Sequence, residues 1–208
     1  MRERSKRRKK IIIGLTGGVG AGKSMVTGLL KKQYGALILE ADSICRKLME
    51  PAGPAYDAVL DCLGSGILRS DGTIDTAAMA RIIFQDSEKR SRINGILHPA
   101  TFEAVRKRMS NSRKKLIVYE SALPREARFS ELCDYVLLVS ASEEIRRKRL
   151  AASRGYSDEK ISAIMESQLS EQAFRQLSDA VLVNESDEAQ CAAELKRILT
   201  DWGITAVL

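Results

Sequence analysis

The segment at residues 14–24, GLTGGVGAGKS, constrains the fold more than any other part of this 208-residue chain. It follows the apolar run at residues 11–13 and precedes an amphipathic segment, so it joins a buried strand to a helix. Within it, Gly17 and Gly22, followed by Lys23 and Ser24, match the phosphate-binding pattern GxxxxGK[ST]. A glycine-rich turn without a ligand is the simpler alternative, but the Lys-Ser pair at this offset favours a nucleotide.

The chemistry of such a loop explains why these residue types are needed. Successive backbone N–H groups point at the β-phosphate, at the positive end of the helix dipole, and glycines let the backbone approach closely. Lys23 is expected to reach the β- and γ-phosphates, and the Ser24 hydroxyl is expected to complete a Mg²⁺ shell. The sequence therefore predicts binding of ATP or GTP together with Mg²⁺.

Apolar strands alternate with helices over most of the chain, which predicts an α/β fold: a parallel sheet with helices on both faces. Strands are expected within residues 9–17, 35–42, 114–123, 133–142 and 179–185. Helices are expected at residues 23–34, 143–154, 157–177 and 187–202, with Ser157 as an N-cap.

The segment between the second and third strands has a different character. Residues 43–111 show helical periodicity interrupted by turns, and RSDGTID at residues 69–75 is a turn signal before a helix capped by Asp75 or Thr76. The expected organisation is a basic tail at 1–10, a P-loop core at 11–42 and 112–208, and a mainly helical insertion at 43–111.

The charge is concentrated in the tail. The chain carries +7, of which residues 1–10 supply +6, so the remainder is close to neutral. This distribution argues against a nucleic-acid-binding domain. A solvated leader is favoured over a segment that attaches to nucleic acid or an anionic membrane.

The sequence also indicates where the protein is located and whether its cysteines are oxidised. No apolar run is long enough for a membrane span, and a secretory signal would have to use the glycine-broken loop segment. The four cysteines lack CxxC spacing, so free thiols in a reducing cytosol and a cytoplasmic location are expected.

Several nucleotide-using classes are disfavoured by missing motifs. Asp71-Gly72 supplies neither the DxxG switch nor the guanine-reading motif of a GTPase, and Glu120 after LIVY is a poor match to the acidic pair of a motor ATPase. A small-molecule kinase remains, in which Asp42 at the carboxyl end of the second strand accepts the proton of an attacking hydroxyl. Asp42 could instead serve as the N-cap of the next helix.

Five segments of the chain together resemble the dephospho-coenzyme A kinase family. They are GLTGGVGAGKS, the block beginning EADSICRKLMEPAGPAYDAV, RIIFQDSEKRSRINGILHPATFEAV, ESALPREARF and QLSEQAFRQLSDAVLVNE. The resemblance implies a P-loop kinase fold with an inserted helical substrate domain and a lid at residues 143–160. It also implies ATP-dependent phosphorylation of the ribose 3′-hydroxyl of dephospho-coenzyme A, with Mg²⁺.

The resemblance assigns roles to particular residues. Asp42 falls on the second acid of the family's DxD as the base, His98 with Pro99 on its His-Pro in the substrate domain, and Arg149 on a basic lid position. His98 is expected to have a structural or substrate-contacting role at the start of a helix, while Gln168 and Asn184 are candidates for the adenine side or for packing. The ATP loop comprises Gly17, Gly18, Val19, Gly20, Ala21, Gly22, Lys23, Ser24 and Met25.

The sequence departs from the family pattern at four places. Glu40 replaces the first acid of DxD, and VLVN ends the last strand where VIDN is usual. Ser153-Arg154 stands where the lid commonly has Arg-Asp. LPREARF replaces a more apolar segment, and because burying an arginine is costly, the loop around Arg125 is expected to be exposed.

The expected function is a phosphotransferase with an alcohol acceptor, the last step of coenzyme A synthesis. A P-loop kinase for another hydroxyl or nucleotide acceptor is the alternative. The expected partners are ATP, Mg²⁺ and dephospho-coenzyme A, with no membrane, no specific nucleic acid, and a monomer or weak homo-oligomer.

Overall fold

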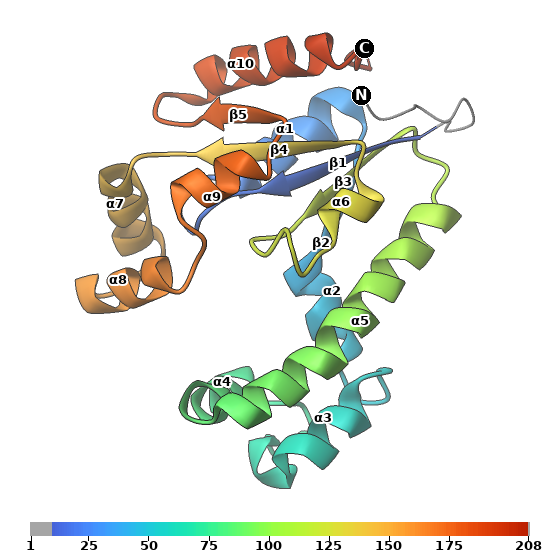
Figure 1. Ribbon diagram of the computed structural model, residues 1–208, viewed down its shortest axis with the longest axis vertical. Coiled ribbons are helices and arrows are strands. Elements are labelled where there is room, and N and C mark those ends of the chain that lie inside the picture. Colours follow the sequence, from blue (N-terminus) through green and yellow to red (C-terminus); the bar gives the residue numbers. More distant parts are fainter. Residues whose placement is uncertain (1–9, 208) are drawn as a thin grey trace. The chain divides into compact units, whose positions relative to one another are not determined.

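The computed structural model describes residues 10–207, so all of the basic tail except Lys10 lies outside the described part. The chain forms two compact units (Figure 1). The P-loop unit contains the residues up to Leu39 and those from Ser112 onward, and the helical unit is Glu40–Asn111.

The P-loop unit is built on a five-stranded sheet with the strand order β2-β3-β1-β4-β5. The pairs β1–β3, β1–β4 and β4–β5 are parallel, with Leu15 opposite both Glu120 and Leu137. The strands are β1 (Ile11–Thr16), β2 (Leu37–Glu40), β3 (Leu116–Glu120), β4 (Tyr135–Ser140) and β5 (Ala180–Val183). The expected α/β fold with a parallel sheet is confirmed.

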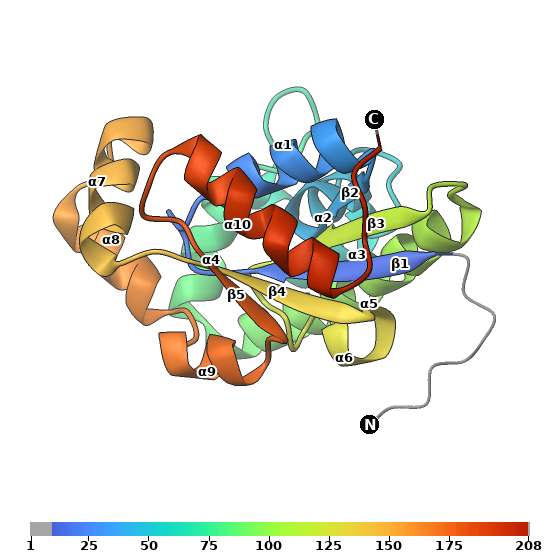
Figure 2. The same cartoon turned by 90° about the horizontal axis from the view of Figure 1, so that it is seen from above.

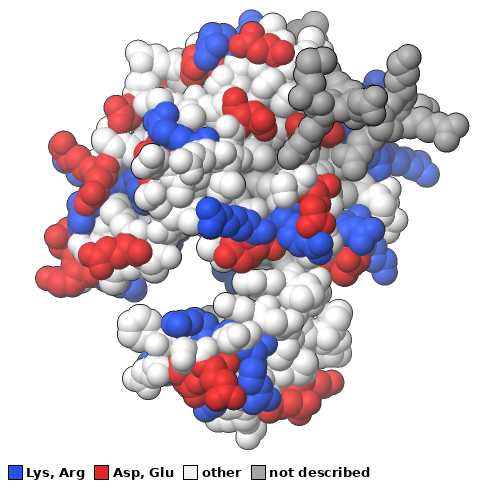
Figure 3. Space-filling view, viewed as in Figure 1, with Lys and Arg blue, Asp and Glu red and all other residues white. Residues whose placement is uncertain are grey.

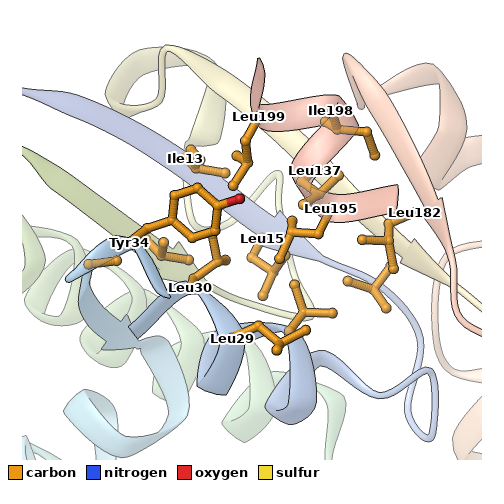
Figure 4. Close-up of a cluster of buried hydrophobic side chains, with 14 of the residues drawn as sticks. Ile13, Leu15, Leu29, Leu30, Tyr34, Leu137, Leu182, Leu195, Ile198 and Leu199 are labelled. Atoms are coloured by element: carbon orange, nitrogen blue, oxygen red, sulfur yellow. The ribbon is translucent and has the colours of Figure 1, made fainter. Parts of the chain in front are cut away.

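Helices α1 (Lys23–Tyr34) and α10 (Glu188–Asp201) cover one face of the sheet. Alternate strand residues, including Ile13, Leu15 and Leu137, point into this layer and pack against Leu30 and Leu195 (Figure 4). All five of these side chains are fully buried, so this cluster anchors the loop that leaves β1.

The opposite face is covered by α6 (Phe129–Leu132) and α9 (Glu171–Gln176), as Figure 2 shows. The ring of Phe129 lies 5.2 Å from that of Tyr119 and passes so close to Gly14 that a Cβ there would be 2.5 Å from it. Burial on both faces explains why the inner strands are apolar throughout rather than alternating.

The segment at residues 157–177, expected as one helix, forms two. Helix α7 (Glu143–Arg154) precedes α8 (Asp158–Glu166), which begins at the predicted Ser157 cap. The chain then leaves the helix, and the hydroxyl of Ser170 accepts a hydrogen bond from Ala173 N at the start of α9. Periodicity did not reveal this break because a serine is compatible with a helix interior as well as with a cap.

The helical unit contains α2 (Ala41–Leu48), α3 (Tyr56–Leu63), the short 3₁₀ helix η1 (Ser65–Ile67), α4 (Thr76–Gln85) and α5 (Ser87–Asn111). The first, second and fourth of these pack against α5, whose Ile93, Leu97 and Val105 are buried. The predicted cap of α4 is confirmed, because Asp75 Oδ1 accepts from the N–H groups of Ala77 and Ala78.

One local expectation in this unit is wrong, and one alternative interpretation is excluded. His98 does not begin a helix but lies inside the 25-residue α5, with Pro99 directly after it. The helix continues through this proline although it removes one backbone donor, because buried residues on both sides hold α5 in place. Asp42 is not an N-cap, since α2 begins at Ala41 and its N-cap is Glu40.

The described surface is of mixed charge. Figure 3 shows basic and acidic side chains interspersed over the face in view, as expected from the near-neutral sequence after the tail. Cys45, Cys62, Cys133 and Cys191 are free thiols, as predicted. Within residues 10–207, no helix is long and apolar enough to cross a bilayer.

Candidate phosphate-binding and catalytic site

The loop between β1 and α1 leads into a helix whose first turn has no capping side chain. Gly22 is the N-cap of α1, with φ 95° and no side-chain hydrogen bond to the first turn. The leading N–H groups of α1 are therefore not satisfied by a capping side chain, and a helix start in this state favours an anion. The geometry agrees with the predicted phosphate loop.

Lys23 lies across this loop. Its Nζ donates to the carbonyl oxygen of Gly17 at 2.8 Å and to that of Gly18 at 3.4 Å, and lies 3.7 Å from Glu120 Oε1. The side chains of Lys23 and Glu120 are only 14% and 16% exposed, so the pair is shielded from water. The ammonium group is thus already held over the loop.

Sequence reasoning treated Glu120 only as a poor motif match and missed its place in the site. The residue ends β3, the strand paired with β1, and lies opposite Leu15. A signal was present, because an acid at the carboxyl end of a parallel strand next to the loop-bearing strand lies at the ligand-binding edge of such sheets.

The predicted lid residue Arg149 and the candidate Asn184 both contact the loop at Ala21. Asn184 Nδ2 donates to the carbonyl oxygen of Ala21 at 2.8 Å, and Arg149 Nη1 donates to the same atom at 3.4 Å. Asn184 is 1% exposed, which favours packing beneath the loop over contact with an adenine.

Gln168 and Arg146 hold the loop at a second point, Val19. Gln168 Oε1 accepts from Val19 N at 2.9 Å, and Arg146 Nε donates to Val19 O at 2.8 Å. Arg146 was not singled out from the sequence, since six of the seven residues from Glu143 to Arg149 are charged and no spacing distinguishes this arginine.

The two last positions of the predicted loop differ in exposure. Ser24 is exposed at the start of α1, whereas Met25 is half-buried and packs against the apolar cluster of Figure 4. A hydroxyl that reaches solvent beside Lys23 is suited to a hydrated Mg²⁺. Among residues 10–207, no three His, Cys, Asp or Glu side chains are grouped to hold a metal by themselves.

A cavity of about 620 Å³ lies beside α7, bordered by the ends of β4 and β5 and by α8 and α9. Ser140 Oγ donates to Glu171 Oε1 at 2.7 Å in its wall. Three arginines and four glutamates line the cavity, so it has no excess of positive charge to attract a triphosphate. The loop, not this cavity, is the better phosphate site.

Asp42 and His98 belong to the helical unit. Asp42 is exposed in the first turn of α2, two residues after β2 ends, and His98 is half-buried in α5. The two helices pack against each other, and Thr101 of α5 lies near enough to Cys45 of α2 to lower the pKa of its thiol. Burial, and to a lesser extent the charge of Asp42, raises the pKa of the Cys45 thiol, so Asp42 lies near this helix contact.

Most of the residues that depart from the family pattern are on the surface, although Pro124 is buried. Arg125 is exposed as predicted, and Glu40 is exposed at the end of β2. Ser153 Oγ donates to the carbonyl oxygen of Arg149 at 2.6 Å, while the Arg154 guanidinium lies 5.8 Å from the centre of the Tyr156 ring. Arg154 is therefore engaged at the end of α7, away from the loop contacts made by Arg149.

Gly22→Ala is expected to abolish the loop geometry. A Cβ at this position would collide with Asn184 Nδ2, and a φ of 95° is disfavoured for alanine by about 1–2 kcal/mol. We expect ADP affinity, measured by calorimetric titration, to fall at least about tenfold.

Gly28→Ala is the matched control for this change. Gly28 lies in the same helix, and a Cβ there meets nothing within 4 Å. ADP affinity should be unchanged, and the helix should gain up to about 1 kcal/mol of stability. Equal ADP affinities for the two variants would contradict this account of Gly22.

Comparison with known proteins places this geometry in a family. A model of the dephospho-CoA kinase family matches residues 11–190. A dephospho-CoA kinase of Carboxydothermus hydrogenoformans is 35% identical over 194 residues, covering 92% of this chain and 94% of that protein. One from Methylococcus capsulatus is 33% identical over 196 residues, covering 94% and 98%.

Solved structures show the same fold. TT1252 from Thermus thermophilus superposes with a TM-score of 0.81 at 27% identity, covering 92% of this chain and 97% of that one. Dephospho-CoA kinase from Campylobacter jejuni gives 0.67 at 17% identity, covering 92% and 96%. A shikimate kinase from Acinetobacter baumannii, at 0.54 and 15%, shares the fold over 93% and 96% of the two chains. With the family match extending from β1 to the first turn of α10, the chain belongs to the dephospho-CoA kinase family.

Proposed function

We propose that this chain transfers the γ-phosphoryl group of ATP to the ribose 3′-hydroxyl of dephospho-coenzyme A, giving coenzyme A and ADP. The observation that carries the proposal is the extent of the family match. It covers residues 11–190, and so includes both the phosphate loop and the whole helical unit. A match to the loop alone would support only nucleotide binding.

The donor half of the reaction is assigned to the P-loop unit. ATP phosphates bind the N–H groups at the start of α1, and Lys23 moves from the carbonyl oxygens of Gly17 and Gly18 to the β- and γ-phosphates. Arg149, whose guanidinium already lies against the loop at Ala21, adds positive charge where negative charge develops.

Mg²⁺ is the metal that suits the oxygen donors present. The exposed Ser24 hydroxyl and the shielded Glu120 carboxylate are hard oxygen ligands of the kind Mg²⁺ prefers, used together with phosphates and water. When bound, the ion would offset charge on the β- and γ-phosphate oxygens.

The acceptor half is assigned to the helical unit, which we propose as the substrate domain. The 3′-oxygen attacks the γ-phosphorus, the bond from that phosphorus to the β–γ bridging oxygen breaks, and ADP leaves with the electron pair. The proton of the hydroxyl passes to the Asp42 carboxylate, which is exposed and so accessible to a ligand. His98 is proposed to support the acceptor from α5.

A coupled ADP-release assay with an acceptor screen tests the proposal. We expect turnover with dephospho-coenzyme A at millimolar ATP, and little or none with shikimate, nucleosides or nucleoside monophosphates. Thermal stabilisation by dephospho-coenzyme A gives an independent measure of acceptor binding. Turnover with one of the other acceptors alone would assign the chain to a different P-loop kinase activity.

A further inference from the structure

Both backbone polar groups of Val19, its N–H and its C=O, are bound by side chains from a distant part of the chain. Val19 N donates to Gln168 Oε1 at 2.9 Å, and Val19 O accepts from Arg146 Nε at 2.8 Å. Arg146 Nη2 also donates to Gln168 Oε1, at 3.4 Å, which closes the ring of contacts. We call these three residues the Val19 clamp.

The neighbouring glycines allow the clamp to form. A Cβ on Gly18 would collide with the guanidinium of Arg146, and one on Gly20 would lie 2.9 Å from the carbonyl oxygen of Arg146. Arg146 therefore packs directly onto the loop backbone, with both its side chain and its main chain. Its burial lowers the pKa of the guanidinium, while the charges of Glu171 and Glu143 oppose this shift.

The two side chains of the clamp lie at opposite ends of one structural arm. Arg146 is in the first turns of α7, and Gln168 follows the end of α8. Between them, Arg147 ties α7 to α8, donating to Asp158 Oδ1 at 2.7 Å and to Ser162 Oγ at 3.0 Å. The α7–α8 arm thus contacts the loop at Val19 through side chains from both ends of the arm.

We infer that Arg146 and Gln168 are positioning residues that order the phosphate loop before the nucleotide arrives and couple the α7–α8 arm to nucleotide binding. A loop already held in its binding geometry loses less conformational entropy when ATP binds. Arg146 acts here through the Val19 carbonyl group, so its contribution differs from that of an arginine that contacts the transferred phosphoryl group.

Gln168→Met removes the acceptor while nearly preserving the shape of the side chain. The variant loses the hydrogen bonds that Gln168 Oε1 accepts from Val19 N and from Arg146. This loss should weaken ADP binding about tenfold and raise the KM for ATP by a similar factor. The kcat at saturating ATP should stay within about twofold, because the clamp acts on loop order and not on the transition state. Arg146→Met should show the same pattern.

The double variant distinguishes one clamp from two separate contacts. If Arg146 and Gln168 act as a unit, the double variant should bind ADP about as weakly as either single variant, whereas independent effects would multiply to about a hundredfold. Amide exchange of the unliganded protein, followed by mass spectrometry on a peptide containing Val19, should be faster in both single variants. This readout involves neither acceptor nor turnover.

Two exposed residues supply matched controls: Gln172→Met on α9 and Lys148→Met on α7 should leave ADP affinity and loop exchange unchanged. Should Gln168→Met fold poorly, Gln168→Ala serves the same test. Unaltered ADP affinity and exchange in the clamp variants would overturn the inference, as would a loss of kcat at unchanged KM for Arg146→Met. The inference depends on the proposed function only in one respect, namely that the loop binds a nucleotide. Failure of the acceptor assay with these binding results intact would therefore count against the substrate alone.

Discussion

Lys23→Met should reduce kcat/KM for ATP by about 10³-fold, the largest effect expected from a single change in the P-loop unit. The ammonium group is held 2.8 Å from the Gly17 carbonyl oxygen and 3.7 Å from Glu120, in surroundings that exclude most water. In such surroundings the attraction between the lysine ammonium group and the negatively charged phosphates is strong, because solvent screens it poorly. Steady-state kinetics over a range of ATP concentrations measures the loss.

Lys31→Met is the control for this variant, since Lys31 is an exposed lysine in the last turn of the same helix. Its kinetics should match those of the unaltered chain. Activity of Lys23→Met within about threefold of the unaltered chain would exclude Lys23 from phosphoryl transfer.

Asp42→Asn should lower kcat by about 10²- to 10⁴-fold while leaving ADP affinity unchanged. The amide keeps the size of the carboxylate but cannot accept the proton of the attacking hydroxyl. Because Asp42 is exposed in the first turn of α2, the substitution should not disturb the packing of the helical unit. Single-turnover measurements with dephospho-coenzyme A separate the chemical step from binding.

Asp57→Asn provides a control in the same structural setting, an exposed acid in the first turn of α3. This variant also loses the favourable interaction between a carboxylate and the positive end of a helix dipole, but Asp57 lies outside the proposed site. A kcat for Asp42→Asn equal to that of Asp57→Asn would rule out Asp42 as the base.

Local signals predicted most of the secondary structure. The GxxxxGKS pattern, the Ser157 and Asp75 caps and the apolar strands are each carried by a few adjacent residues, and each is confirmed in the structure. The errors concern His98, Asp42 and the 157–177 helix. At these places the sequence permits two outcomes, and the packing of α5 with its neighbouring helices, or of α9 on the sheet, selects one.

Contacts between distant segments could not be predicted in the same way. Glu120 is 97 residues from Lys23 in sequence, and Gln168 is 149 residues from Val19. Their approach depends on strand order and on where α8 ends, and neither is encoded by a local pattern. Arg146 in particular cannot be distinguished by composition from Arg147, which binds α8 instead of the loop.

The sequence alone therefore predicted the α/β class, from the alternation of apolar strands and helices along the chain, and the phosphate loop with its lysine and serine, from a pattern of adjacent residues. Tertiary structure decided which side chains hold that loop. Parallel pairing of β1 with β3 brings Glu120 to Lys23, and the turn after α8 brings Gln168 beside Arg146 at Val19. A backbone group that is shielded from water needs hydrogen-bond partners, and for the half-buried Val19 the fold supplies them from the α7–α8 arm.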